Sequence, residues 1–143
     1  MKEKLKTLFE DIQQILDPTD IAYHEVLENG ALKPFYKTNI DKLTPEQWEE
    51  VHSKIKLNLN DDPVLAKLLT EKEPLIMSDV DGHPNPPEAF KTFGIKSNLV
   101  YPVRKDNRTV GLVVIAYIAR KHEFTDKEVS NCGKLVEIFN KNF

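Results

Sequence analysis

Residues 94–118, GIKSNLVYPVRKDNRTVGLVVIAYI, contain the strongest strand signal in the chain. Two runs rich in β-branched and aromatic residues, 95–104 and 109–118, are separated by the four polar residues 105–108. Such runs are typical of strands, and a short polar connection joins two strands as an antiparallel hairpin. The stretch therefore predicts two neighbouring antiparallel strands.

Side chains along the first of these strands point alternately to the two faces of the sheet. Asn98 and Val100 share one face with Lys96, whereas Leu99 and Tyr101 share the other. We expect Leu99 and Tyr101 to pack under helices, which places Asn98 and Val100 on the opposite face, because the alternation has a strict period of two.

Amphipathic helices are predicted at both ends of the chain, at residues 1–16 and 124–143. Apolar residues recur at helical spacing in both segments, and Lys and Glu occupy the remaining positions. Thr125 and Glu128 have the spacing of a capping box at the start of the last helix. The two wide apolar stripes also suggest a homodimer formed through the terminal helices.

Shorter elements fill the region between them. Residues 21–28 and 31–38 read as strands joined at Asn29-Gly30, a pair that favours a type I′ turn, and Pro34 marks the second strand as an edge strand. The further predicted elements are a helix from Thr44 that includes Trp48, a helix over 62–73, a strand over 75–80 and a short helix over 87–93. Hairpins with flanking helices indicate an α+β fold with one antiparallel sheet, in a single domain spanning 1–143.

Composition excludes several classes of function. The 143 residues include 20 Lys and Arg against 23 Asp and Glu, a net charge of −3. This balance argues against nucleic acid as a partner. The longest nearly unbroken apolar run, 110–119, is too short for a membrane-spanning helix, and the charged N-terminus does not resemble a signal peptide. We therefore expect a cytoplasmic protein without a membrane partner.

Three segments, in order, resemble the GAF domain family. DPVLAKLLTEKEPLIMSDV (62–80) resembles the family's helix, turn and strand ending in Asp-Val. GIKSNLVYPVRKDNRTVGLVVIA (94–116) resembles its Gly-Ile-x-Ser strand and charged hairpin, and FTDKEVSNCGKLVEIF (124–139) resembles its closing capped helix. The resemblance implies a sheet of five or six strands with the terminal helices on one face, and middle helices and loops over a small-molecule pocket on the other.

By this resemblance, the polar amide of Asn98 faces the pocket, where it contacts either a ligand or a neighbouring loop. Tyr23 and Glu25, on one face of the first strand, are placed in the same pocket; the alternative for Glu25 is exposure to solvent at the end of the strand. Asp79 belongs either to the site or to a simple turn of the chain. The candidate ligand-binding residues are Tyr23, Glu25, Asp79, Phe90, Phe93, Asn98, Val100 and Ala116.

Catalysis is the weakest hypothesis. In layout the chain resembles the free methionine sulfoxide reductase branch of the family, which requires reactive cysteines before the Gly-x-x-Ser strand. Residues 81–97 contain no cysteine, and the single cysteine, Cys132, lies on the apolar stripe of the last helix. No metal cluster or cofactor signature is visible either, so neither metal nor cofactor is expected. Asp79, Asp81 and His83 read as a solvated loop rather than a metal site.

Two hypotheses remain for the function. The first is a sensory domain that binds an unidentified small molecule and dimerises. The second is a dimerisation or interaction scaffold with a vestigial pocket. Phe90 and Phe93 fit both hypotheses, because aromatic side chains can line a pocket or fill it.

Overall fold

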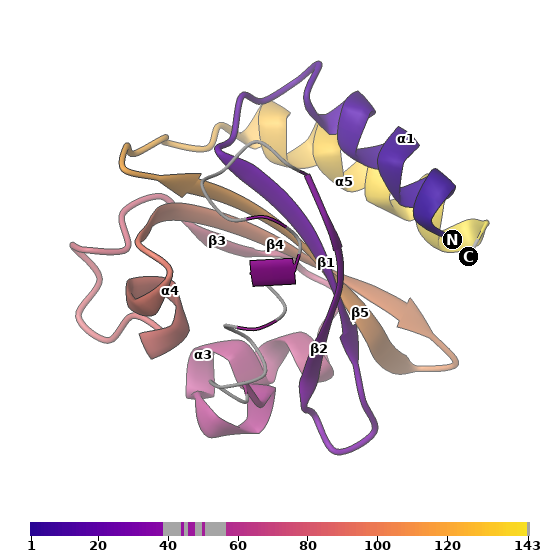
Figure 1. Cartoon of the computed structure of the whole chain (residues 1–143), viewed down its shortest axis with the longest axis horizontal. Coiled ribbons are helices and arrows are strands. Elements are labelled where there is room, and N and C mark those ends of the chain that lie inside the picture. Colours follow the sequence, from indigo (N-terminus) through magenta and orange to yellow (C-terminus); the bar gives the residue numbers. More distant parts are fainter. Residues whose placement is uncertain (39–43, 45, 48–49, 51–56, 143) are drawn as a thin grey trace.

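A five-stranded antiparallel sheet forms the centre of the computed structural model, with helices on both faces (Figure 1). The structure describes residues 1–38, 44, 46–47, 50 and 57–142. The strand order is β2-β1-β5-β4-β3. The strands are β1 (Asp20–Val26), β2 (Leu32–Lys37), β3 (Leu75–Met77), β4 (Ile95–Lys105) and β5 (Arg108–Ile118). This confirms the predicted α+β class and the position of the Pro34 strand, β2, at an edge.

The helices divide between the two faces of the sheet. In Figure 1, α1 and α5 lie side by side on one face, and α3 and α4 lie on the opposite side of the sheet. The helical segments are α1 (Lys2–Ile12), η1 (Leu59–Asp61), α3 (Pro63–Ala66), η2 (Lys67–Leu69), α4 (Glu88–Thr92) and α5 (Asp126–Lys141). The terminal helices are thus shorter than the predicted 1–16 and 124–143. The predicted helix over 62–73 is a short α-helix followed by a 3-10 turn.

The capping box predicted at Thr125 and Glu128 is present at the start of α5. Thr125 Oγ1 accepts a hydrogen bond from the Glu128 N–H, and Glu128 Oε1 accepts one from the Thr125 N–H, at 3.1 and 2.9 Å. Thr44 and Gln47 make the same reciprocal pair at 3.2 and 3.0 Å. Trp48 and residues 51–56 of the helix predicted from Thr44 lie outside the described residues.

The two hairpins use different turns. In the β4–β5 hairpin, Asp106 and Asn107 have φ of 54° and 62°, the conformation of a tight two-residue turn. At the β1–β2 hairpin only Gly30 has a positive φ, 86°, and its N–H donates to the Leu27 carbonyl. The predicted type I′ turn at Asn29-Gly30 is therefore wrong, because a three-residue connection with one left-handed glycine closes this hairpin.

The sheet separates two apolar cores. The helix-side core joins the sheet to α1 and α5. Its buried residues are Leu5, Leu8, Phe9, Ile12, Leu16, Ile21, Tyr23, Leu99, Tyr101, Val103, Val113, Ile115, Tyr117, Phe124, Cys132, Val136 and Phe139. The pocket-side core lies on the other face. Its buried residues are Val26, Leu59, Leu65, Leu68, Met77, Val80, Phe90, Ile95, Val100, Leu112 and Ala116. The predicted alternation along β4 is confirmed, since Leu99 and Tyr101 belong to one core and Val100 to the other.

Candidate functional site

Asn98 is the most unusual side chain of the pocket-side face. It lies on β4 directly opposite Met77 of β3 and Ala116 of β5, and both of these neighbours belong to the pocket-side core. The residue is 0% exposed. Within the part of the chain that the structure describes, neither Nδ2 nor Oδ1 has a hydrogen-bond partner.

This arrangement is energetically unfavourable for an isolated domain. A buried polar group without a partner costs about 1–3 kcal/mol, and most buried polar side chains in folded proteins are hydrogen-bonded. Asn98 offers two N–H donors and one carbonyl acceptor. An orphaned amide of this kind is a feature that a ligand with matching groups can satisfy.

A small apolar cavity lies on the same face of the sheet, although Asn98 and Ala116 do not line it. Val100, the next residue of β4 on the same face, lines it together with Phe90 and Phe93, and its volume is about 70 Å³. Phe90 is buried and Phe93 is partly exposed. The remaining lining residues are His24, Leu32, Leu57, Leu59, Leu65, Leu68, Ala89, Ile95, Leu112 and Val114. The structure thus brings Asn98, Val100, Phe90, Phe93 and Ala116 to one side of the sheet, as predicted; ligand contact by these residues stays a prediction.

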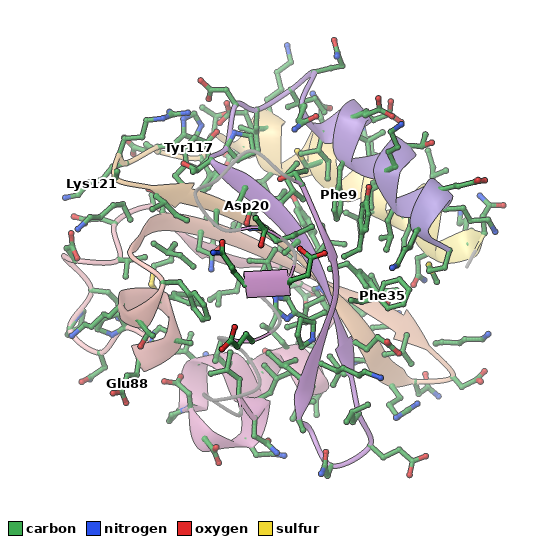
Figure 2. All side chains as sticks on the ribbon, viewed as in Figure 1. Phe9, Asp20, Phe35, Glu88, Tyr117 and Lys121 are labelled. Atoms are coloured by element: carbon green, nitrogen blue, oxygen red, sulfur yellow. The ribbon has the colours of Figure 1, made fainter. Side chains whose placement is uncertain are left out.

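A buried ion pair, not predicted from the sequence, lies on the same face. Asp20 of β1 is directly opposite Ala116, and its Oδ2 lies 2.9 Å from Lys37 Nζ. The two side chains are 11% and 0% exposed. Thr38 Oγ1 donates to Asp20 Oδ1 at 2.6 Å. Asp20 lies in the interior of the molecule in Figure 2, whereas Glu88 and Lys121 lie at its periphery.

The placement of Tyr23 and Glu25 in this pocket is wrong. Tyr23 belongs to the helix-side core, where its ring makes an edge contact with Phe139 of α5 at a centroid distance of 6.1 Å. Burial, together with the charge of Glu25, raises the pKa of its hydroxyl. Glu25 lies near Tyr23 in a surface cleft with Phe35 and Arg108. The sequence prediction assigned the wrong face of β1 to the pocket. Ala22, His24 and Val26 on the other face are also buried, so the alternation of apolar residues did not distinguish the two faces.

Asp79 is also outside the site. Its carboxylate stabilises a turn at the surface instead. Its Oδ1 accepts a hydrogen bond from the Gly82 N–H at 3.0 Å and lies 3.0 Å from Lys121 Nζ. The bond with Lys121 and the Gly82 N–H lower the pKa of the Asp79 carboxyl. The neighbouring Asp81 is paired with Lys96 at 2.9 Å. Among the described residues there is no group of three or more His, Cys, Asp or Glu side chains that could hold a metal ion.

Cys132 is a core residue. It is 0% exposed, and burial, with a smaller contribution from the Glu128 charge, raises the pKa of its thiol to about 11. The thiolate is the reactive form of cysteine, so this side chain has the environment of a small apolar core residue. None of the described helices is long and apolar enough to cross a membrane.

A five-stranded antiparallel sheet with the terminal helices on one face, and short helices beside a small apolar cavity on the other, defines a small α+β domain. The GAF domain family model matches residues 2–135, and the chain belongs to this family. Among curated proteins, no sequence matches the chain.

Solved structures show the same fold at low sequence identity. The GAF domain/HD domain protein from Geobacter sulfurreducens has a TM-score of 0.76 at 19% identity, covering 97% of this chain and 88% of that chain. The domain of a putative two-component sensor histidine kinase protein from Sinorhizobium meliloti 1021 has a TM-score of 0.74 at 16% identity, and the match covers 99% of this chain and 90% of that chain.

One similar structure is an enzyme. The free methionine-R-sulfoxide reductase from Neisseria meningitidis, solved in complex with its substrate, has a TM-score of 0.69 at 15% identity, covering 98% of this chain and 77% of that chain. At such identities the similarity establishes the fold alone, and a shared fold does not establish a shared function.

Proposed function

We propose that this GAF domain is a sensory module that binds a small molecule on the pocket-side face of the sheet, with Asn98 as a polar anchor. The buried amide of Asn98, without a hydrogen-bond partner among the described residues, carries the proposal. Sensory proteins among the structural relatives support the class. The domain acts by binding rather than by catalysis; the buried, high-pKa thiol of Cys132 supports this part.

Ligand binding can be transmitted to the terminal helices through β4. This strand presents Asn98 to the pocket side and Tyr101 to the helix side, where Tyr101 Oη donates to the Val129 carbonyl of α5 at 2.5 Å. A ligand that bonds to Asn98 favours one position of β4, and hence one packing of α5. The effect is a shift between two states that differ in their affinity for the ligand.

A thermal-shift screen of amino acids, nucleotides and inorganic anions tests the proposal. At least one compound should raise the melting temperature of the wild type. Asn98→Ala should weaken the binding of that compound at least tenfold, about 1.4 kcal/mol, while Asn85→Ala, at an exposed loop position, should not. Absence of any stabilising compound, or equal binding by Asn98→Ala, contradicts the proposal.

The second candidate, an interaction scaffold with a vestigial pocket, is favoured by one observation. The cavity beside Phe90 has a volume of only about 70 Å³, well below the roughly 300–1,000 Å³ of ordinary ligand pockets. This alternative predicts that no small molecule is retained. Native mass spectrometry of freshly purified protein separates the two, because a retained ligand adds a defined mass.

Homodimerisation through the terminal helices stays a prediction, and so does a cytoplasmic location. The apolar stripes that suggested a dimer are accounted for within one chain, because Leu5, Leu8, Ile12, Val136 and Phe139 pack in the helix-side core. Ile138, 59% exposed, remains on the outer surface of α5. Analytical ultracentrifugation of the wild type and Ile138→Ser tests whether this surface mediates association.

A further inference from the structure

A surface groove lies between β4 and α5, away from the pocket-side cavity. Tyr101 and Pro102 of β4 line it together with Ser130 and Gly133 of α5. Its volume is about 710 Å³, against about 70 Å³ for the cavity beside Phe90. None of the described residues lines both spaces, so the groove is a separate surface of the domain.

The charge of this groove is opposite in sign to that of the whole chain. Its lining contains five basic and two acidic residues, namely Lys72, Arg104, Lys105, Lys134 and Lys141 against Asp106 and Glu137. The chain as a whole carries a net charge of −3. A local excess of positive charge on an acidic protein favours a partner with negative charge, because complementary potentials steer association and fix its register.

Arg104 is the cation that is fixed most firmly in the groove. Its guanidinium group is partly buried and donates to the carbonyls of Leu69 and Asn107 and to Thr109 Oγ1, at 3.0, 2.9 and 2.9 Å. These three acceptors are uncharged, and the described residues give this guanidinium no carboxylate partner. A guanidinium group has five N–H donors, so Arg104 retains donors for an anionic group of a partner.

The backbone of β4 limits how a partner can bind here. β3 pairs only with residues 98–100 of β4, and the groove begins where this pairing ends. Pro102 has no N–H to donate, and the Arg104 N–H already donates to Asn140 Oδ1 at 3.1 Å. A peptide added as a further strand would find no donor at either position, so recognition depends on side chains rather than on strand addition.

The composition of the groove favours a peptide over other anionic partners. Tyr101, Pro102 and Val136 are buried beneath it and provide an apolar floor. Nucleic acid is disfavoured by the two carboxylates in the lining and by the acidic chain. The flat surface of a membrane cannot enter a concave site. A segment that combines carboxylates with apolar side chains matches both the basic rim and the apolar floor.

We propose that the groove between β4 and α5 is a docking site for a peptide segment of a partner protein in which Glu or Asp residues are mixed with apolar residues. The carboxylates pair with Lys72, Lys134 and Arg104, and the apolar side chains rest on Tyr101 and Pro102. The inference is independent of the proposed small-molecule function, because the two sites share no lining residue among those described.

Fluorescence anisotropy with three labelled hexapeptides tests the chemistry of the partner. The probes are Glu-Leu-Glu-Glu-Leu-Glu and the same peptide with every Glu replaced by Gln or by Lys. The proposal predicts saturable binding of the Glu peptide, which weakens as salt is added because salt screens exposed charges, and at least about tenfold weaker binding of the other two. Equal binding of the Gln peptide, or no binding of the Glu peptide, overturns the proposal. Binding of an oligodeoxythymidine or of anionic lipid vesicles in place of the Glu peptide also overturns it.

Matched charge reversals test the position of the site. Lys134→Glu on α5 and Lys72→Glu before β3 should each weaken binding of the Glu peptide at least about fivefold. Lys127→Glu on α5 and Lys67→Glu on η2 are the controls, because these lysines are also exposed but do not line the groove. All four variants change the net charge equally, so a purely long-range effect would weaken binding in all of them. Equal losses in the four variants, or unchanged affinity in both groove variants, overturn the assigned site.

Discussion

The hydroxyl group of Tyr23 on β1 occupies the space that a Cβ atom would take at Gly111 on β5. The tyrosine is 1% exposed, and its hydroxyl has no hydrogen-bond partner among the described residues. The absence of a side chain at Gly111 thus allows a large aromatic ring to lie flat on the sheet beneath the terminal helices.

Gly111→Ala should therefore destabilise the domain by about 1–3 kcal/mol, as overpacking of a core does. Gly133→Ala is the matched control. A Cβ at Gly133, within α5, would meet Tyr101 at 3.4 Å, an ordinary contact, and alanine favours helix by up to about 1 kcal/mol. Urea unfolding should show a loss for the first variant and no loss for the second. Equal effects would contradict the close packing of Tyr23 on Gly111.

Ile12→Ala should lower the free energy of unfolding by about 2–5 kcal/mol, because it removes a fully buried side chain from the helix-side core. Ile138→Ala, on the same kind of element but 59% exposed, should change it by less than about 0.5 kcal/mol. Denaturant titrations of both variants provide the comparison. A stable Ile12→Ala protein would mean that α1 does not cover the sheet.

Cys132 should be unreactive in the folded protein. With its pKa raised to about 11 by burial, its thiolate population at pH 8 is small, and burial also blocks access. Labelling with a disulfide reagent should be at least about 100-fold slower in the native protein than in urea. One rapidly labelled thiol per native chain would show that α5 opens or is misplaced.

Glu128 should make stability depend on pH. Burial tends to raise its pKa, but hydrogen bonds from the Thr125 N–H and His122 outweigh burial, and the net pKa is lowered. A carboxyl with a lower pKa in the folded state stabilises the protein above its unfolded pKa, and this contribution is lost as the pH falls through the folded value.

The stability difference between the wild type and Glu128→Gln should thus be full at neutral pH and shrink below the ordinary glutamate pKa of 4.5. Glu123→Gln, at an exposed neighbouring position, serves as the control and should show no such trend. A pH-independent difference for Glu128→Gln would mean that the charge of this carboxylate is not what stabilises the start of α5.

Strong local signals allowed most of the fold to be predicted. Each of these signals depends on residues of a single helix or strand. They are the apolar runs of β4 and β5, the capping box at Thr125, and the alternation of Leu99 with Asn98. The face of β1 could not be predicted, because Ile21 and Tyr23 are as apolar as Ala22 and Val26, and both sets are buried. Two-sided burial removes the amphipathic signal that fixes a strand's orientation.

The residues of the candidate site could likewise be predicted from the sequence only in part. The position of Asn98 was predictable because Lys96 and Asn98 make one face of β4 more polar than the face of Leu99 and Tyr101, and the family resemblance indicated which face lies toward the pocket. The Asp20–Lys37 pair was not, because it joins the start of β1 to the end of β2, and which residues meet there depends on the register of the hairpin. That register depends on the three-residue turn at Gly30, rather than the predicted two-residue turn, and on a register shift between Tyr23 and His24.

The free energy of unfolding of Asn98→Leu, measured by urea denaturation without added ligand, tests the central claim most directly. Leucine is close to asparagine in shape and removes both orphaned polar atoms. If Asn98 is kept for a ligand, the variant should be as stable as the wild type or more stable, by up to about 1–3 kcal/mol, while its ligand binding is lost. If the variant is destabilised by a similar amount, the amide is satisfied within the fold, and its role as a ligand anchor is contradicted.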